Sequence, residues 1–485
     1  MEVATSGKTT SRGRRYRASF VTRTLAKLAD ESDSKGSYVV GILLFNEKLE
    51  PDVLRTDVLK KLLLIPRFRS KYVSKHFSGY FEEIPEENID VEYHMQVAFD
   101  NQKPSQTEVL AHVSDKMCRE VILDKDKPLW QFTIVPELDD GRGCLITNIS
   151  HVIGDGMSQI EILYRLIDPQ SLADDIPNKT DSGNDDPTFT NAEDSIRPKD
   201  KRPRQRVPKI RAARIFLQGV LGGMFAVLGR PDPQTSLKLK TVTSVSVEKR
   251  QALTDKILLD KLKDVKNKIE DATVNDILVV LLTRCLRKYF EEHDGKKLKN
   301  LSASFPISMR KKGESSFDKY GSPHNKFAYG MIPLHLKYKN TLDLIWKVKR
   351  TVDEAKLSPN GIVQQQLGKM IQPFVTKKVI NGIALNVGNK STVQLSNVAG
   401  PQKSVSISGF TLDEMAFQLF SPLGLYVGII SYNGQVSCSF NADSSLGKPE
   451  EIAKHWKPEF DELYDEIMSY KGILKRPSRS FFRSF

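Results

Sequence analysis

A histidine followed four residues later by an aspartate and a glycine is the part of this sequence best suited to chemistry. His151, Asp155 and Gly156 come soon after residues 144–149, an alternating apolar run that predicts a β-strand. A neutral imidazole can accept a proton near neutral pH, because its ordinary pKa is about 6.5. The pattern therefore indicates a general base at the end of a strand. Taken alone, such a histidine is more often a hydrogen-bonded structural residue.

A second group of polar residues opens a strongly apolar helix, which the sequence predicts over residues 273–290. Thr273 and Asp276 have the spacing of a capping box, with aspartate in the place of glutamate, so we interpret Asp276 as structural. Asn275 then falls in the first helical turn, where its amide and the free backbone N–H groups could face a carbonyl oxygen. We expect Asn275 either to hold a thioester or its oxyanion, or to be a solvated residue at the helix start.

Together with two other short motifs, these residues resemble the wax ester synthase/acyl-CoA:diacylglycerol acyltransferase family. Residues 128–130 match the family's Pro-Leu-Trp element, and residues 275–276 match its Asn-Asp pair. Residues 396–401 match its Ser-Asn-Val-Pro-Gly-Pro loop, with alanine in the place of the first proline, and are expected to cross between domains. The resemblance extends from about residue 37 to about residue 470.

The sequence departs from the family pattern in two places. The family motif begins with two histidines. Ser150 occupies the place of the first, and His151 corresponds to the second, which is the catalytic one in the family. The family's Pro-Leu-Ser-Pro segment near the N-terminus is also missing. A long insert, around residues 168–228, is similar to that of plant-type members.

The resemblance implies an α/β fold of two chloramphenicol-acetyltransferase-like domains, each a mixed sheet flanked by helices, with a tunnel between them. It implies an O-acyltransferase in which His151 deprotonates the hydroxyl of a fatty alcohol or a diacylglycerol. The oxygen then attacks the thioester of acyl-CoA without an acyl-enzyme. Acyl-CoA is a co-substrate in this reaction, and neither a metal nor another cofactor is expected.

The resemblance also implies structural roles around the site. Asp155 would be turned away from the substrate and paired with an arginine, for which Arg310 is the candidate. Gly156 would allow a tight turn or a close backbone approach. Pro128 and Trp130 would have a packing role, with the large Trp130 ring shaping the acyl channel.

Composition divides the chain into five regions. We expect a disordered basic N-terminus (1–36), an N-terminal acyltransferase domain (37–167), a flexible linker (168–237), a C-terminal acyltransferase domain (238–470) and a basic, aromatic tail (471–485). The linker begins with a stretch rich in Asp, Asn, Ser, Thr and Pro. Such a stretch cannot bury enough apolar surface to offset the loss of chain entropy.

The second part of the linker combines a cationic block, residues 199–214, with an apolar run, residues 215–228. As a helix the apolar run would be roughly 20 Å long, shorter than the roughly 30 Å of a bilayer core. We therefore expect residues 199–229 to attach the protein to a membrane or lipid-droplet surface rather than to span it. The predicted location is the endoplasmic reticulum membrane, with the catalytic domains in the cytosol. A helix packed on the protein's own surface is the alternative.

The overall composition limits the classes of function. The 485 residues are 39% hydrophobic and 27% charged, which excludes bulk disorder. The net charge of +13 fits an anionic membrane or the phosphates of CoA, and without a nucleic-acid motif we expect no nucleic-acid partner. The four cysteines lie far apart and predict reduced, buried side chains rather than disulfides or a zinc site. The first 19 residues lack the apolar core of a signal peptide.

Two alternative interpretations remain open: a different acyltransferase with the same motif, and a protein without catalytic activity. Plant BAHD acyltransferases and peptide-synthetase condensation domains also contain a His-x-x-x-Asp-Gly element. The first group usually has a C-terminal Asp-Phe-Gly-Trp-Gly element that this chain lacks, and the second requires a neighbouring carrier protein. The second alternative is a catalytically silent lipid-binding or membrane-tethering protein, suggested by Ser150 and by the basic and apolar insert.

Overall fold

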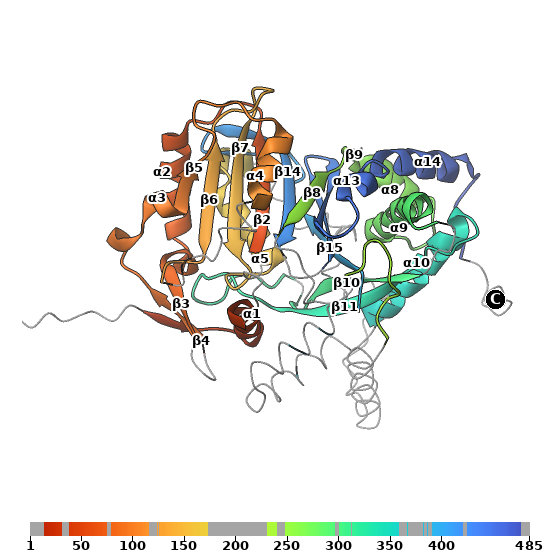
Figure 1. Ribbon diagram of the computed structural model, residues 1–485, viewed down its shortest axis with the longest axis horizontal. Coiled ribbons are helices and arrows are strands. Elements are labelled where there is room, and N and C mark those ends of the chain that lie inside the picture. Colours follow the sequence, from red (N-terminus) through yellow and green to blue (C-terminus); the bar gives the residue numbers. More distant parts are fainter. Residues whose placement is uncertain are drawn as a thin grey trace, which may run out of the picture.

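The protein's structure, a computed structural model, contains two mixed β-sheets that lie side by side, each with helices packed on it (Figure 1). The structure describes residues 14–31, 38–74, 79–115, 124, 126–172, 230–239, 248–295, 300–311, 313–357, 366, 382, 386, 390–420 and 424–476. The predictions for the cationic block, the apolar run and residues 477–485 lie outside the described residues. Among the described helices, none is long and apolar enough to cross a membrane.

The N-terminal sheet has six strands in the order β13-β14-β2-β7-β6-β5. They are β2 (Tyr38–Phe45), β5 (Met95–Val97), β6 (Trp130–Val135), β7 (Gly143–Ser150), β13 (Ser406–Ile407) and β14 (Phe410–Phe420). Helices α2 (Pro51–Leu63) and α5 (Gly156–Leu166) cover one face, and α4 (Gln106–Asp115) covers the other. Short helices η1 (Pro66–Arg69), η2 (Glu86–Asn88) and α3 (Val91–His94) connect the strands. Because both faces of β2 are buried, its sequence is continuously apolar apart from one glycine.

The C-terminal sheet has seven strands, with β11-β10-β12-β15-β16-β8 in order and β9 paired with β16. They are β8 (Lys249–Leu253), β9 (Ile257–Leu258), β10 (Leu301–Ser308), β11 (Phe327–Leu334), β12 (Val393–Ala399), β15 (Leu425–Tyr432) and β16 (Gln435–Asp443). The helices of this domain are α8 (Leu259–Asn267), α9 (Val274–His293), α10 (Thr341–Leu357), α13 (Pro449–Ala453) and α14 (Trp456–Ser469).

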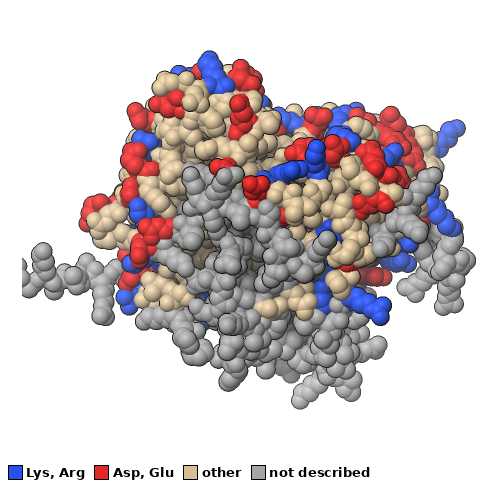
Figure 2. Space-filling model, viewed as in Figure 1, with Lys and Arg blue, Asp and Glu red and all other residues tan. Residues whose placement is uncertain are grey.

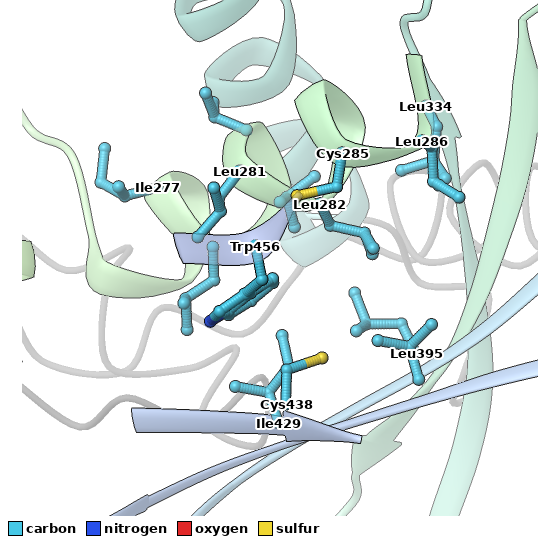
Figure 3. Packing of buried hydrophobic residues seen from close by; sticks show 14 of the residues in the cluster. Ile277, Leu281, Leu282, Cys285, Leu286, Leu334, Leu395, Ile429, Cys438 and Trp456 are labelled. Atoms are coloured by element: carbon cyan, nitrogen blue, oxygen red, sulfur yellow. The ribbon is translucent and has the colours of Figure 1, made fainter. Parts of the chain in front are cut away.

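Helix α9 forms the centre of the C-terminal domain. It packs against the sheet and against four other helices of the domain, which explains why its sequence is apolar on nearly every side. Figure 3 shows its residues Ile277, Leu281 and Cys285 near Trp456, with Cys438 of β16 below the indole ring. The described cysteines, Cys144, Cys285 and Cys438, are buried and free, as the sequence predicts.

The chain crosses between the two sheets after β12. Residues 400–405 lead out of the C-terminal sheet to the hairpin β13–β14, which joins the N-terminal sheet, and the chain then returns as β15. Strand β14 pairs with β2 over its length, for example Phe417 with Gly41. The predicted crossover is therefore confirmed, although residues 396–399 belong to a strand rather than a loop. The predicted domain 238–470 thus contains one hairpin of the other sheet.

The prediction of a disordered N-terminus was wrong for residues 14–31. Strand β1 (Arg15–Arg17) joins a small third sheet with β4 (Gly79–Glu83) and β3 (Ser70–Ser74), and helix α1 (Phe20–Glu31) follows it. Tyr16 and Ala18 are buried with Phe81 and Val152 in a small cluster. These few apolar contacts come from distant parts of the chain, so the polar local composition did not indicate them.

Both ends of the predicted flexible linker are also ordered. Helix α6 (Pro169–Leu172) continues from the N-terminal domain, and Asp168 accepts hydrogen bonds from the backbone N–H groups of Ser408 and Gly409 at 3.0 and 2.7 Å. At the other end, Oδ2 of Asp232 accepts the N–H groups of Ser302 and Thr392, each at 2.8 Å. By binding backbone amides at the C-terminal sheet and in the β13–β14 turn, these carboxylates hold both ends of the linker in place.

The described surface carries both signs of charge. Figure 2 shows Lys and Arg interleaved with Asp and Glu on one face, with acidic residues gathered over α14. That helix contributes Asp461, Glu462 and Asp465. The described part of this face therefore presents no continuous basic surface, despite the positive net charge of the whole chain.

Candidate active site

His151 lies just beyond the end of β7, in the wall of a cavity between the two sheets. Its ring centroid is 5.5 Å from that of Phe327, on strand β11 of the opposite sheet. Burial lowers the pKa of His151 from its ordinary value of 6.5, and the carboxylate of Asp155 opposes this only in part. The imidazole is therefore neutral at physiological pH and can accept a proton.

The cavity has two chemically different walls. It encloses about 1400 Å³ of empty space, measured out to the solvent at its mouth. The wall formed by the N-terminal sheet and α5 is largely apolar and includes Val39, Leu43, Ile149, Ile160, Leu163, Met415, Phe417 and Leu419. The wall formed by the C-terminal sheet is mixed, since Pro306, Phe327, Leu395, Val398 and Ile430 lie there beside the polar side chains Ser304, Ser308, Gln394, Ser396 and Tyr426. The arrangement suits a ligand with a long apolar part and a polar part.

Asp155 organises the turn that follows His151. Its Oδ1 accepts the backbone N–H of Ser158 at 3.2 Å and so caps α5. Its Oδ2 accepts Nη1 of Arg310 and the backbone N–H of Lys326, each at 2.8 Å. The ion pair with Arg310 that the sequence left as a possibility is therefore present. The carboxylate is fully engaged by these donors, which is the arrangement of a structural residue rather than of a triad partner.

The two glycines in this turn differ in the space around them. A Cβ on Gly154 would lie 2.7 Å from the Cβ of Ser158, which the turn cannot accommodate. A Cβ on Gly156 would lie 3.7 Å from Cγ2 of Val398 on the opposite sheet, at ordinary contact distance. Space does not require glycine at position 156, and the close approach that the sequence assigned to Gly156 is found instead at Gly154.

Asn275 and Asp276 are placed differently from each other. Asp276 completes the predicted capping box: its Oδ2 accepts the N–H of Thr273 at 2.8 Å, and its own N–H donates to the Thr273 hydroxyl at 3.3 Å. Asn275 is buried, and its side-chain oxygen accepts a hydrogen bond from the amide of Asn397 on β12. Asn397 contributes to the cavity wall, whereas Asn275 does not. Any effect of Asn275 on a ligand would therefore pass through Asn397.

The Pro-Leu-Trp element belongs to the core rather than to the cavity wall. Pro128 is buried at the entry to β6. Trp130 is fully buried, donates from Nε1 to the carbonyl of Phe68 at 2.8 Å, and stacks on His94 with ring centroids 4.3 Å apart. The expectation that its ring shapes the acyl channel was wrong, and Phe132, two residues further along β6, lines the cavity instead.

The sequence reasoning also missed residues close to His151. Phe327 and Asn325 come from the start of β11, more than 170 residues away along the chain, and no spacing rule connects them with the histidine. The apolar face of α5 could have been found from its helical periodicity. Within the described ranges, no group of three or more His, Cys, Asp or Glu side chains could hold a metal ion.

Two mixed sheets joined by an exchanged hairpin, with a histidine in the cavity between them, define a two-domain fold of the chloramphenicol-acetyltransferase type. The structure is similar to that of the wax ester synthase/diacylglycerol acyltransferase from Marinobacter aquaeolei VT8, with a TM-score of 0.57 and 18% identity, over 89% of this chain and 95% of that one. It is also similar to the epimerization domain from the third module of tyrocidine synthetase B, with a TM-score of 0.55 and 12% identity, over 96% and 99% of the two chains.

Sequence comparison identifies the family. The model of the wax ester synthase/diacylglycerol acyltransferase catalytic domain matches residues 38–278, and that of the WS/DGAT C-terminal domain matches residues 324–464. The chain belongs to the wax ester synthase/diacylglycerol acyltransferase family. It is 21% identical to wax ester synthase/diacylglycerol acyltransferase 5 of Arabidopsis thaliana over 87% of this chain and 88% of the relative. It is also 21% identical to the O-acyltransferase WSD of Acinetobacter baylyi, over 93% and 96%.

Replacing Arg310 by methionine should destabilise the protein by about 3 kcal/mol, because it leaves the buried Asp155 carboxylate without its counter-charge. The two side chains are only 5% and 7% exposed. Urea unfolding followed by tryptophan fluorescence measures the change. Lys326→Met is the matched control, since the Lys326 side chain pairs with Glu314 at the surface while its backbone N–H still binds Asp155. The control should cost less than about 1 kcal/mol, and equal losses would contradict the assignment.

Proposed function

We propose that the protein transfers a long-chain acyl group from acyl-CoA to a fatty alcohol or to a diacylglycerol. The observation that carries the proposal is the half-buried, neutral imidazole of His151 in the wall of a largely apolar cavity between two domains. The printed names of the relatives, wax ester synthase/diacylglycerol acyltransferase and O-acyltransferase, support the same chemistry.

The reaction follows from the position of the base. His151 accepts the proton of the acceptor's hydroxyl as the oxygen attacks the thioester carbonyl, and a tetrahedral oxyanion forms. The C–S bond then breaks, the ester carbonyl re-forms, and the thiolate of CoA takes the proton back from the imidazolium. No acyl-enzyme is formed, acyl-CoA serves as a co-substrate, and no other cofactor takes part.

The two walls of the cavity suggest how the substrates are held. Acyl chains would lie along the apolar wall of α5 and the N-terminal sheet, since burying them there removes apolar surface from water. Polar parts of the substrates would face Ser304, Ser396 and Gln394. The Nε2 atom of Gln394 is buried and has no hydrogen-bond partner among the described residues, so it can donate to a substrate oxygen.

We further propose that the protein acts at a lipid surface, at the endoplasmic reticulum membrane or on lipid droplets, through residues 199–229. The motivation is the sequence alone, a cationic block beside an apolar run. A silent lipid-binding protein is the competing proposal, because Ser150 stands where the family has its first histidine. Ser150 is buried at the end of β7, and its hydroxyl accepts the N–H of Val152 at 3.3 Å.

Replacing His151 by alanine should abolish acceptor-dependent release of CoA thiol from palmitoyl-CoA, with a loss of about 10² to 10⁴ in rate. Purified protein would be assayed with hexadecanol, with dioleoylglycerol and with no acceptor. His293→Ala is the control, because His293 lies at the exposed end of α9. Absence of thiol release from the wild-type protein with either acceptor, while it still binds lipid vesicles, would favour the silent lipid-binding protein.

The acid limb of kcat/KM should have its midpoint below the ordinary histidine pKa of 6.5. The pKa of His151 is lowered, so the neutral base persists as the pH falls and is lost only when the pH passes through the lower value. Rates measured between about pH 5 and pH 8, with circular dichroism to confirm folding, test this. A midpoint above the ordinary value would show that the base is another group or that His151 is not desolvated.

Replacing Ile160 by tryptophan should shift the preference of the enzyme toward shorter acyl chains. Ile160 faces the cavity from α5, and an indole there would occupy the space of several methylene groups. The ratio of kcat/KM for palmitoyl-CoA to that for octanoyl-CoA should fall about tenfold or more. Tyr164→Trp, on the same helix but outside the cavity wall, should leave the ratio unchanged. An unchanged ratio in the Ile160 variant would place the acyl chain elsewhere.

A further inference from the structure

Helix α1 is hydrogen-bonded to the backbone of the histidine turn through a buried side chain, Asn325. The amide nitrogen of Asn325 lies 2.9 Å from the carbonyl oxygen of His151, 3.3 Å from that of Val152 and 3.1 Å from the hydroxyl oxygen of Thr22. Asn325 is 2% exposed, and Thr22 is fully buried. Three segments that are far apart in the sequence therefore meet at one amide group.

The carbonyl that Asn325 holds is close to the catalytic ring. The carbonyl of His151 itself and the side chain of Asn325 both favour the protonated imidazole and so raise the pKa of His151 against the effect of burial. Holding this carbonyl fixes the backbone from which the ring projects, and the ring's Nδ1 atom is buried without a hydrogen-bond partner of its own among the described residues. Because Asn325 donates to this carbonyl, the position of Asn325 influences the orientation of the imidazole.

The position of Asn325 depends in turn on α1. The Thr22 hydroxyl oxygen accepts from Asn325 and from the hydroxyl of Ser19, which lies 3.0 Å away. The same Ser19 hydroxyl lies 3.3 Å from the backbone carbonyl oxygen of Asn325, which is an alternative acceptor for its single proton. Neither Thr22 nor Ser19 lines the cavity, and both precede residue 38, where the match to the catalytic-domain model begins.

We propose that α1 is a positioning element for His151: Thr22 and Ser19 hold Asn325, which holds the carbonyls of His151 and Val152. This proposal rests on the acyl transfer proposed above. It predicts that the start of α1, which touches no substrate, affects turnover rather than substrate binding. A misplacement of the base by a fraction of an ångström is enough to slow proton transfer.

The test compares three single variants of the full-length protein. Thr22→Val removes the hydroxyl with little change in volume, and kcat should fall about tenfold, the effect of one hydrogen bond of about 1.4 kcal/mol. KM for palmitoyl-CoA should stay within about twofold. Thr22→Ser keeps the hydroxyl and should restore most of kcat. Thr24→Val is the matched control, because the Thr24 hydroxyl donates to the carbonyl of Phe20 within the helix. It should leave kcat unchanged.

A double variant separates positioning from general stability. In an Asn325→Ala background, Thr22→Val should have no further effect on kcat, because the connection is already broken. Additive losses, or a kcat of Thr22→Val within twofold of the wild type, would overturn the proposal. Hydrogen exchange of the amides at residues 151–155 should be faster in Thr22→Val than in Thr24→Val. This readout needs no activity, so an inactive wild-type protein would refute the proposed function while exchange still decides whether α1 holds the turn.

Discussion

The buried ion pair between Asp155 and Arg310 is the interaction on which the rest of the site depends. Asp155 belongs to the turn between β7 and α5, and Arg310 follows β10, so the pair joins the two walls of the cavity. A buried charge that loses its partner is strongly destabilising, because neither water nor another charge replaces it. The pair therefore sets the separation of the two sheets at the level of His151. His151 is half-buried and still faces the cavity, because the ion pair keeps this separation constant.

Burial of His151 has two effects that act in the same direction. Desolvation disfavours the imidazolium, so the resting ring is neutral and ready to accept a proton. The apolar wall around it also limits water, which would otherwise compete with the acceptor's hydroxyl for the thioester. Asn325 and the carbonyl of His151 moderate the first effect by favouring the protonated ring. The surroundings of His151 therefore limit the access of water, and they still allow the imidazole to accept a proton during the reaction.

Short sequence patterns correctly predicted the elements whose structure depends on interactions between residues that are close together in the chain. The capping box of Thr273 and Asp276, the buried strand 38–45 and the position of His151 after a strand depend on neighbouring residues, and all are present. The parts that were missed depend on contacts between distant segments. Trp130 looked like a channel residue but stacks on His94, and residues 14–31 looked too polar to fold but are held by Phe81 and Asn325. No local composition contains that information.

The exchanged hairpin β13–β14 affects how the protein folds during its synthesis. Strand β14 pairs with β2, although 372 residues separate the starts of the two strands, Tyr38 and Phe410. During synthesis from the N-terminus, the N-terminal sheet therefore exposes an unpaired strand edge until about residue 420 has left the ribosome. Most of the second domain is already outside the ribosome by then. The segment 38–278, which the catalytic-domain model matches, therefore lacks strand β14, which pairs with β2 in its sheet.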